Sequence, residues 1–190
     1  MKIILVRHGR PASLERSPIS GRDLGLWVTR YNELGIARDV PPPESVVRLV
    51  ATARCVVASD LRRSIESARW LTSSSDVRID PGLREAALPE SLRVSVRMPP
   101  GLWVVLARIA WWLRWCHSEE TVDAVQQRAV RAADRLCALA GEHGSVAVVG
   151  HGMFNRFIAR ELVRRGWRGP TWLPAAHWTV ATFMRSEQPV

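Results

Sequence analysis

Short apolar runs alternate with amphipathic stretches along most of this 190-residue chain. Runs rich in β-branched residues predict buried strands at residues 3–6, 55–58, 77–79, 145–149 and 178–184. Apolar residues at helical spacing predict helices at residues 26–34, 44–51, 61–71, 119–140 and 153–164. This alternation predicts an α/β fold, a three-layer α/β/α sandwich with a mostly parallel central sheet.

The helix predicted at residues 61–71 carries two further signals. Ser59 or Asp60 precedes it, and both residue types are good helix N-caps. Its buried face is expected to consist of the residues at helical spacing, Leu61, Ile65, Ala68 and Leu71.

Residues 99–115 depart from this alternation of strands and helices and contain four of the nine tryptophans. Arg108 and Arg114 interrupt the apolar run, which is too short to predict a membrane span. Three interpretations stay open: a cap helix over an active site, a partner-binding surface, or a helix lying in a membrane interface, where Trp and Arg are both favoured. We therefore expect one domain over residues 1–190 with a Trp-rich, cap-like insertion at about residues 90–118.

Composition narrows the class of protein. The net charge of +9 comes almost entirely from arginine, which favours anionic partners or reflects the base composition of the coding DNA. The three cysteines lack CxxC spacing, which argues against a disulfide framework and a zinc site. The first apolar run is too short for a secretory signal, so we expect a cytoplasmic protein. No recognition motif supports a nucleic-acid partner.

Chemistry-bearing residues gather at the ends of three predicted strands. His8-Gly9 and His151-Gly152 each follow a strand, and a third strand leads into Ser59 and then Arg63. Ligands of open α/β sheets bind at the carboxyl ends of the strands. Arginine matches phosphate oxygens in a bidentate way, and a neutral imidazole can attack phosphorus. The pattern therefore indicates phosphoryl transfer.

The same motifs resemble the histidine phosphatase superfamily, also called the phosphoglycerate mutase-like family. The opening strand ending in Arg-His-Gly corresponds to residues 3–9, the Ser-x-Leu-x-Arg motif to residues 59–63, and the second histidine motif to residues 148–152. The resemblance covers the whole chain except roughly residues 90–118. It implies a phosphoglycerate mutase-like fold.

The resemblance also implies roles for individual residues. His8 would be the phosphorylated nucleophile, and the groups around the phosphoryl oxygens would be Arg7, Arg63, His151 and Gly152. Arg62 would lie on the helix surface. A Leu-x-Glu context makes Glu85 the candidate acid/base, with a solvated loop carboxylate as its alternative and Glu90 as the fallback residue.

The chain departs from the mutase pattern directly after Arg-His-Gly. Mutase members commonly continue with Glu-Thr-x-x-Asn, whereas this chain continues with residues Arg10 to Leu14. Ser13 or Ser17 could partly substitute for the missing polar side chains. We therefore favour a phosphatase over a phosphoglycerate mutase-type phosphotransferase. Ser13, His177 and Trp111 are expected at the pocket rim.

The expected function is phosphomonoester hydrolysis of the histidine acid phosphatase type, through a phosphohistidine and without metal or cofactor. A tryptophan-lined cap would favour a small-molecule phosphomonoester with a hydrophobic part. The rival hypothesis is a non-catalytic member that binds a partner, or a membrane peripherally, through residues 99–115. The sequence leaves the oligomeric state open.

Overall fold

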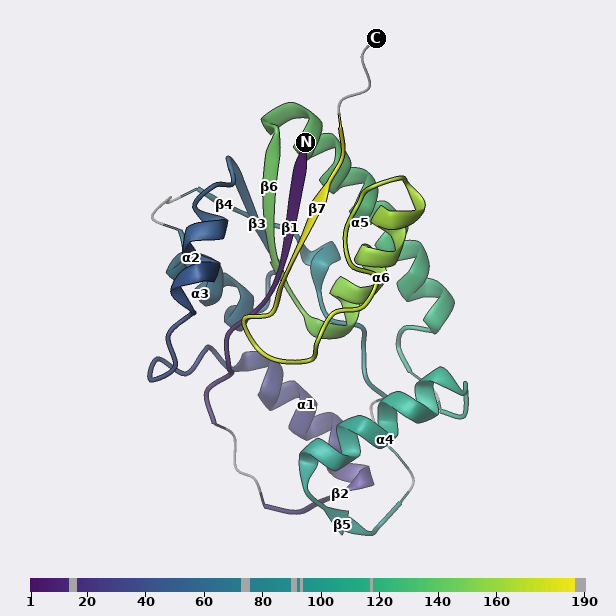
Figure 1. Ribbon diagram of the computed structural model, residues 1–190. Helices are drawn as coiled ribbons and strands as arrows, with labels where there is room; N and C mark the ends of the chain where they lie inside the picture. Colours follow the sequence, from purple (N-terminus) through teal and green to yellow (C-terminus); the bar gives the residue numbers. More distant parts are fainter. Residues whose placement is uncertain (14–16, 73–75, 90–91, 93, 117, 187–190) are drawn as a thin grey trace.

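A five-stranded sheet forms the centre of the protein (Figure 1). The computed structural model describes residues 1–13, 17–72, 76–89, 92, 94–116 and 118–186. The strands lie in the order β4-β3-β6-β1-β7, and only β7 runs antiparallel to its neighbour. Their bounds are β1 Lys2–Arg7, β3 Cys55–Ala58, β4 Val77–Ile79, β6 Ser145–Gly150 and β7 Val180–Met184. The predicted mostly parallel α/β sheet is confirmed.

Helices cover both faces of this sheet (Figure 1). One face carries α2 (Glu44–Val50) and α3 (Arg62–Leu71), and the other carries α5 (Val122–His143) and α6 (Gly152–Arg164). Successive side chains of a strand point to opposite faces, so β1 serves both layers. Its Ile4 packs in the core under α2 and α3, while Ile3 packs under α5 and α6.

The register of the two central strands determines where the candidate site lies. Arg7 of β1 pairs with Gly150 of β6. The next residues along the two strands are His8 and His151, so the two histidines leave the sheet side by side at its carboxyl edge. β3 ends at the same edge, because Ala58 pairs with Val149.

A small lobe lies below this edge in Figure 1. It contains β2 (Ile19–Ser20), paired with β5 (Arg97–Met98), a 3-10 turn at Gly21–Asp23, and the helices α1 (Leu24–Glu33) and α4 (Pro100–Trp112). Leu24, Trp103 and Ala107 form a core of its own. The indole N–H of Trp103 donates to the Ile19 carbonyl at 2.8 Å, which ties α4 to the start of the lobe. The described part of residues 90–118 thus lies against α1, on the side of the sheet where the two histidines emerge.

Two predicted boundaries shift for local reasons. The last strand begins at Val180 rather than at Trp178, because Trp178 has a positive φ of 59° that a strand cannot contain. α5 begins at Val122 rather than at Glu119, because the Thr121 side chain caps it by accepting from the Ala124 N–H.

The predicted cap of α3 is wrong, and its buried face is confirmed for Ala68 and Leu71 but wrong for Leu61 and Ile65. Neither Ser59 nor Asp60 caps the helix; Leu61 stands at the N-cap without a side-chain bond. The buried residues of α3 are Arg63, Ser64, Ser67, Ala68 and Leu71. The first turns of α3 face the histidines rather than the apolar core, so polar residues occupy the positions where a helix normally buries leucine and isoleucine.

Candidate active site

His8 is held in one tautomer at the end of β1. Its Nδ1 lies 2.7 Å from the Gly9 carbonyl oxygen, which can only accept, so Nδ1 carries the proton. Its Nε2 accepts from the Nε–H of Arg63 at 3.3 Å. Burial, then the neighbouring His151 and Arg63, hold the pKa of His8 well below its usual value of 6.5. His8 is therefore a neutral imidazole with the Nε2 lone pair directed at an arginine.

Arg63 is buried at the start of α3 and is oriented by α1. Its two terminal nitrogens both donate to Asn32 Oδ1 at 3.2 Å, and Nη1 also donates to the Tyr31 carbonyl. The guanidinium lies 4.7 Å from the centre of the Tyr31 ring. The end of α1 thus fixes the arginine that faces the nucleophile.

His151 leaves β6 beside His8, with ring centroids 5.1 Å apart. Its Nε2 lies 2.9 Å from Ser59 Oγ and 3.3 Å from Ser64 Oγ, whose hydroxyls can donate to it. Its Nδ1 is buried without a hydrogen-bond partner in the part of the chain that is described. A serine hydroxyl can donate or accept; in the tautomer in which Nε2 accepts from serine, Nδ1 carries the proton and is a donor for an anionic ligand.

Arg7 contributes a second guanidinium. Nη1 donates to the Ala175 carbonyl, and Nε is buried without a partner among the described residues. A Cβ at Gly152 would lie 3.3 Å from the Arg7 guanidinium, so glycine at this position leaves room for that side chain. Buried donors without acceptors cost free energy, and phosphoryl oxygens are the acceptors that such a set fits.

The loop after His8 is also held closely. The Gly9 N–H donates to Ser67 Oγ at 2.8 Å. The Trp178 ring occupies the place of a Gly9 side chain, since a Cβ there would come within 2.3 Å of it. Only glycine leaves space for this indole next to the nucleophile.

His177 approaches from the segment before β7. Its ring centroid lies 5.6 Å from that of His8. Burial, with Arg7 and Arg10 nearby, lowers the pKa of His177 to about 4. The side chain is therefore neutral at physiological pH, and it borders the cavity described below.

The carboxylate of Glu85 lies at the N-terminal end of α6. Its Oε1 accepts from the Phe154 N–H at 2.8 Å, and its Oε2 accepts from the Met153 N–H at 3.1 Å. The carboxylate is thus positioned by two backbone donors of the helix that follows His151, and it lines a cavity together with Arg63. The fallback residue, Glu90, lies outside the described residues.

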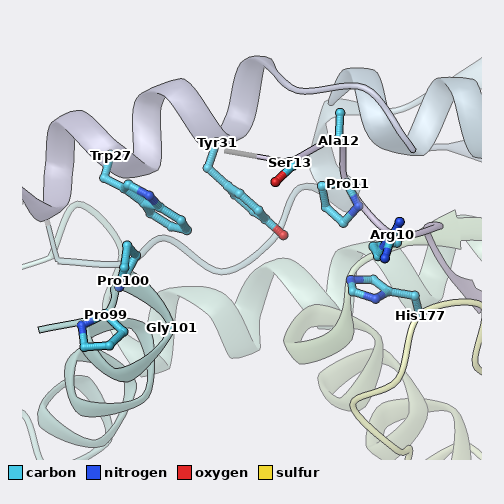
Figure 2. Close-up of a pocket in the computed structure, with 10 residues that line it drawn as sticks. All are labelled: Arg10, Pro11, Ala12, Ser13, Trp27, Tyr31, Pro99, Pro100, Gly101 and His177. Atoms are coloured by element: carbon cyan, nitrogen blue, oxygen red, sulfur yellow. The ribbon is translucent and has the colours of Figure 1, made fainter. Parts of the chain in front are cut away.

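Tyr31 lines two cavities, of which the first also contains His177 and the second contains Arg63, the arginine that donates to His8. The first, of about 580 Å³, is drawn in Figure 2, which shows Trp27 and Tyr31 on one side and Pro99 and Pro100 on the other. It is lined by Arg10, Pro11, Ala12, Ser13, Trp27, Tyr31, Pro99, Pro100, Gly101 and His177. The second, of about 400 Å³, contains Arg63 and Glu85 and the apolar side chains of Val28, Leu61 and Leu88.

Trp111 does not lie at the pocket rim where it was expected. It is 2% exposed, packs in the core with α6, and donates its indole N–H to the Glu120 carbonyl at 2.7 Å. Its position on α4 explains the difference, because Trp103, Ala107 and Trp111 share the face of that helix that packs inward. Ser13 and His177 do line the first cavity. Arg62, as predicted, is a surface residue, paired with Glu66.

Sequence reasoning missed the residues that orient the site from a distance. Tyr31 and Asn32 lie at the end of α1, and Ser64 and Ser67 lie on α3. The spacing of Ser64 and Ser67 on the helix that carries Arg63 was the one available signal, since buried serines on a helix face need a polar partner. Nothing in the local sequence of Tyr31 and Asn32 indicates a contact with Arg63. In the part of the chain that is described, no group of His, Cys, Asp or Glu side chains is arranged to hold a metal ion.

Comparison with known proteins identifies the class that this fold and site define. The profile of the histidine phosphatase superfamily (branch 1) matches residues 3–188, so the chain belongs to this superfamily. No curated protein matches the sequence.

Solved structures share the fold at low sequence identity. A mycobacterial glucosyl-3-phosphoglycerate phosphatase superimposes with a TM-score of 0.58 at 21% identity, over 86% of this chain and 79% of that one. A phosphoserine phosphatase from Entamoeba histolytica, in complex with phosphoserine, gives 0.57 at 12% identity over 96% and 90% of the two chains. A mycobacterial hydrolase gives 0.57 at 20% identity over 93% and 75%. These likenesses support the histidine phosphatase fold.

The three neutral histidines predict an acid-sensitive fold. His8, His151 and His177 all have pKa values below 6.5 in the native state, so the unfolded chain binds more protons as the pH falls below 6.5. Their contribution to the free energy of unfolding is fully present above pH 6.5 and is lost as the pH falls. For His177 the loss runs from pH 6.5 to about 4.

We expect His177→Gln to flatten this dependence relative to wild type between those two pH values. Urea unfolding in phosphate-free buffers measures it, and carboxylate titrations cancel in the difference between the two proteins. Parallel curves for wild type and H177Q would contradict the assignment.

Proposed function

We propose that this protein is a phosphomonoester hydrolase, of the histidine acid phosphatase type, that acts through a phosphohistidine on His8. The observation that carries the proposal is the fixed tautomer of His8, whose Nε2 lone pair faces Arg63 while Nδ1–H is bound by the Gly9 carbonyl. A neutral, oriented imidazole beside a guanidinium is what nucleophilic attack on a phosphoryl group requires. Membership of the superfamily and the phosphatases among the structural neighbours support it.

The first step would form an Nε2–P bond and break the P–O bond to the leaving group. The charge that spreads over the phosphoryl oxygens would meet Arg63, the unpartnered Nε–H of Arg7 and the Nδ1–H of His151. In the second step water would attack phosphorus and return His8 to its neutral form. The lowered pKa of His8 keeps the nucleophile unprotonated into the acid range.

Glu85 is the proposed proton carrier. The departing oxygen needs a proton in the first step, and the attacking water must lose one in the second. Glu85 lines the same cavity as Arg63, and the start of α6 holds its carboxylate in place.

The leaving group is proposed to carry a hydrophobic part that lies in the first cavity. Trp27 and Tyr31 are stacked there, with ring centroids 5.1 Å apart and planes 13° apart, opposite Pro99 and Pro100 (Figure 2). The apolar surface comes from α1 and from the start of α4, not from the tryptophans of residues 103–115. Rigid aromatic and proline surfaces suit an aryl or other apolar ester group better than a polyhydroxylated sugar.

His8→Ala tests the mechanism. We expect wild type to hydrolyse an aryl phosphate without added metal and in the presence of a chelator. H8A should lose at least about 10³-fold in kcat, because the covalent route is removed. His143→Ala, at the end of α5 and outside the site, is the control and should keep its activity.

Two measurements complete this test. Wild type quenched during turnover should hold a phosphoryl group that is stable in alkali and labile in acid, and H8A should hold none. Equal release of phenol and inorganic phosphate supports a hydrolase, whereas a shortfall of phosphate with transfer to an added alcohol would indicate the phosphotransferase alternative. Unchanged turnover by H8A would refute the mechanism.

Glu85→Gln tests the proton carrier. We expect E85Q to slow hydrolysis of alkyl esters by about 10²-fold or more, and of a nitrophenyl ester far less, because a good leaving group departs without a proton. Glu119→Gln is the matched control, since Glu119 lines the same cavity. If E119Q shows this leaving-group dependence and E85Q does not, the assignment to Glu85 is wrong.

Trp27→Ala tests where the leaving group binds. We expect kcat/KM for naphthyl phosphate to fall by about tenfold, which is 1.4 kcal/mol of lost contact, while that for glycerol phosphate changes by less than about twofold. Leu88→Ala removes an apolar side chain from the second cavity and serves as the comparison. If L88A loses kcat/KM for naphthyl phosphate and W27A does not, the leaving group binds in the second cavity instead. If wild type prefers small sugar phosphates, the proposal of a leaving group with a hydrophobic part is wrong.

A further inference from the structure

Glu85 lies on a segment that has no regular structure of its own. The 3-10 turn at Pro81–Leu83 ends just before it, and residues 84–89 belong to no helix or strand. A group that transfers a proton must be held to within about 0.5 Å, and loops hold side chains less precisely than helices do. The precision of Glu85 must therefore come from contacts that its neighbours make with this segment.

Arg128 of α5 supports Glu85 through two of its neighbours. Its Nη1 donates to the carbonyl oxygens of Gly82 and Arg84 at 3.0 and 2.7 Å, which ties the main chain that leads into Glu85 to the helix. Its guanidinium lies 3.9 Å from the ring centre of Phe154, whose N–H donates to Glu85 Oε1. One side chain thus contacts both the residue before Glu85 and a residue that binds its carboxylate.

Arg108 of α4 holds the other side of the same segment. None of the helices that the structure describes, α4 included, is long and apolar enough to cross a membrane. Arg108 is the one charged residue within α4, and it donates to the carbonyl oxygens of Ala86 and Ala87 at 3.0 and 3.3 Å. The Ala86 N–H donates in turn to Glu85 Oε1 at 3.0 Å. The single charge of α4 is therefore directed at the segment that carries Glu85.

Glu120 and Trp111 join the two arginines. The Nε and Nη2 of Arg128 donate to the two carboxylate oxygens of Glu120, each at 2.7 Å. The Glu120 carbonyl accepts from the Trp111 indole N–H, and the Arg108 guanidinium lies 5.0 Å from the centre of a Trp111 ring. The two supports of Glu85 thus belong to one connected set of contacts between α4 and α5.

We propose that Arg128 and Arg108 are positioning residues for the proton carrier, and that α4 serves the reaction through Arg108. This inference rests on the proposed role of Glu85. Among the described residues that line the two cavities, neither arginine occurs, so both would act through Glu85 and not on the substrate. Loss of either support would leave Glu85 chemically intact but displaced, and a displacement of about 1 Å can cost about 10²-fold in rate.

The dependence of rate on leaving group tests this inference at both arginines. Arg128→Lys keeps the positive charge near Glu120 and His151, but an ammonium cannot span the carboxylate and the two carbonyls as the planar guanidinium does. Arg108→Met removes the support on the other side of Glu85. We expect each variant to lose about tenfold or more in kcat for an alkyl phosphate, and less than about threefold for a nitrophenyl phosphate, whose leaving group needs no proton.

Two matched controls separate positioning from stability. Arg165 is 22% exposed against 16% for Arg128, and it also donates to carboxylates and to a main-chain carbonyl, but at the end of α6 remote from Glu85. Arg114, just after α4, forms an exposed ion pair with Asp123. We expect R165K and R114M to keep the wild-type ratio of the two rates. Circular dichroism and urea unfolding check the fold of every variant, and R108M decides the question if R128K does not fold.

A double-variant cycle with E85Q shows whether the effect passes through Glu85. We expect E85Q/R128K to be within about twofold of E85Q for the alkyl phosphate, because the group that Arg128 positions is already lost. Multiplied losses, or equal losses for the two esters, would indicate a purely structural role and overturn the inference. Leaving-group dependence in E85Q but in neither arginine variant would refute this inference alone. Its absence in E85Q would refute the proposed proton carrier and this inference with it.

Discussion

The parallel pairing of β1 with β6 is the constraint on which the candidate site depends. Arg7 lies opposite Gly150, so the two histidines emerge together at the carboxyl edge. Both strands are almost wholly buried between two helical layers, and a slip of one residue would turn every side chain toward the wrong layer. The hydrophobic core thus fixes the register, and the register fixes the distance between His8 and His151.

The site gathers positive and potentially positive groups where water is scarce. Arg63 is 2% exposed, and Arg7 and three histidines lie around it. A buried cation is costly unless it is paired, and the fold lowers that cost in two ways. The pKa values of the histidines are depressed, so they stay neutral. The Asn32 side chain and two main-chain carbonyls, of Tyr31 and Ala175, take up guanidinium donors.

Two buried nitrogens remain, Arg7 Nε and His151 Nδ1, for which this chain supplies no hydrogen-bond partner in its described part. An anion at that position would satisfy them both. The same low dielectric that makes an unpaired buried donor costly makes each contact with a phosphoryl oxygen strong.

The sequence predicts this arrangement to the extent that local signals carry it. Short β-branched runs predicted β3 and β4 residue for residue, and the strand ends predicted the neighbourhood of His8, Arg63 and His151. Asn32 could not be predicted, because its contact with Arg63 depends on how the lobe packs and not on neighbouring residues. Trp111 was misplaced for the same reason: composition cannot say which face of an apolar helix points inward.

α4 shows why that ambiguity matters. A helix that is apolar on every side normally lies inside a core, and an exposed one is normally amphipathic. Apart from Arg108, this helix is apolar on every side, and one of its faces still lies in solvent, so packing against α1 and α6 buries only the inner face. The inner half completes the lobe that encloses the aromatic cavity, while folding of the described chain leaves the outer half uncovered. Stability of the lobe explains the inner face, whereas no part of the described chain covers the outer one.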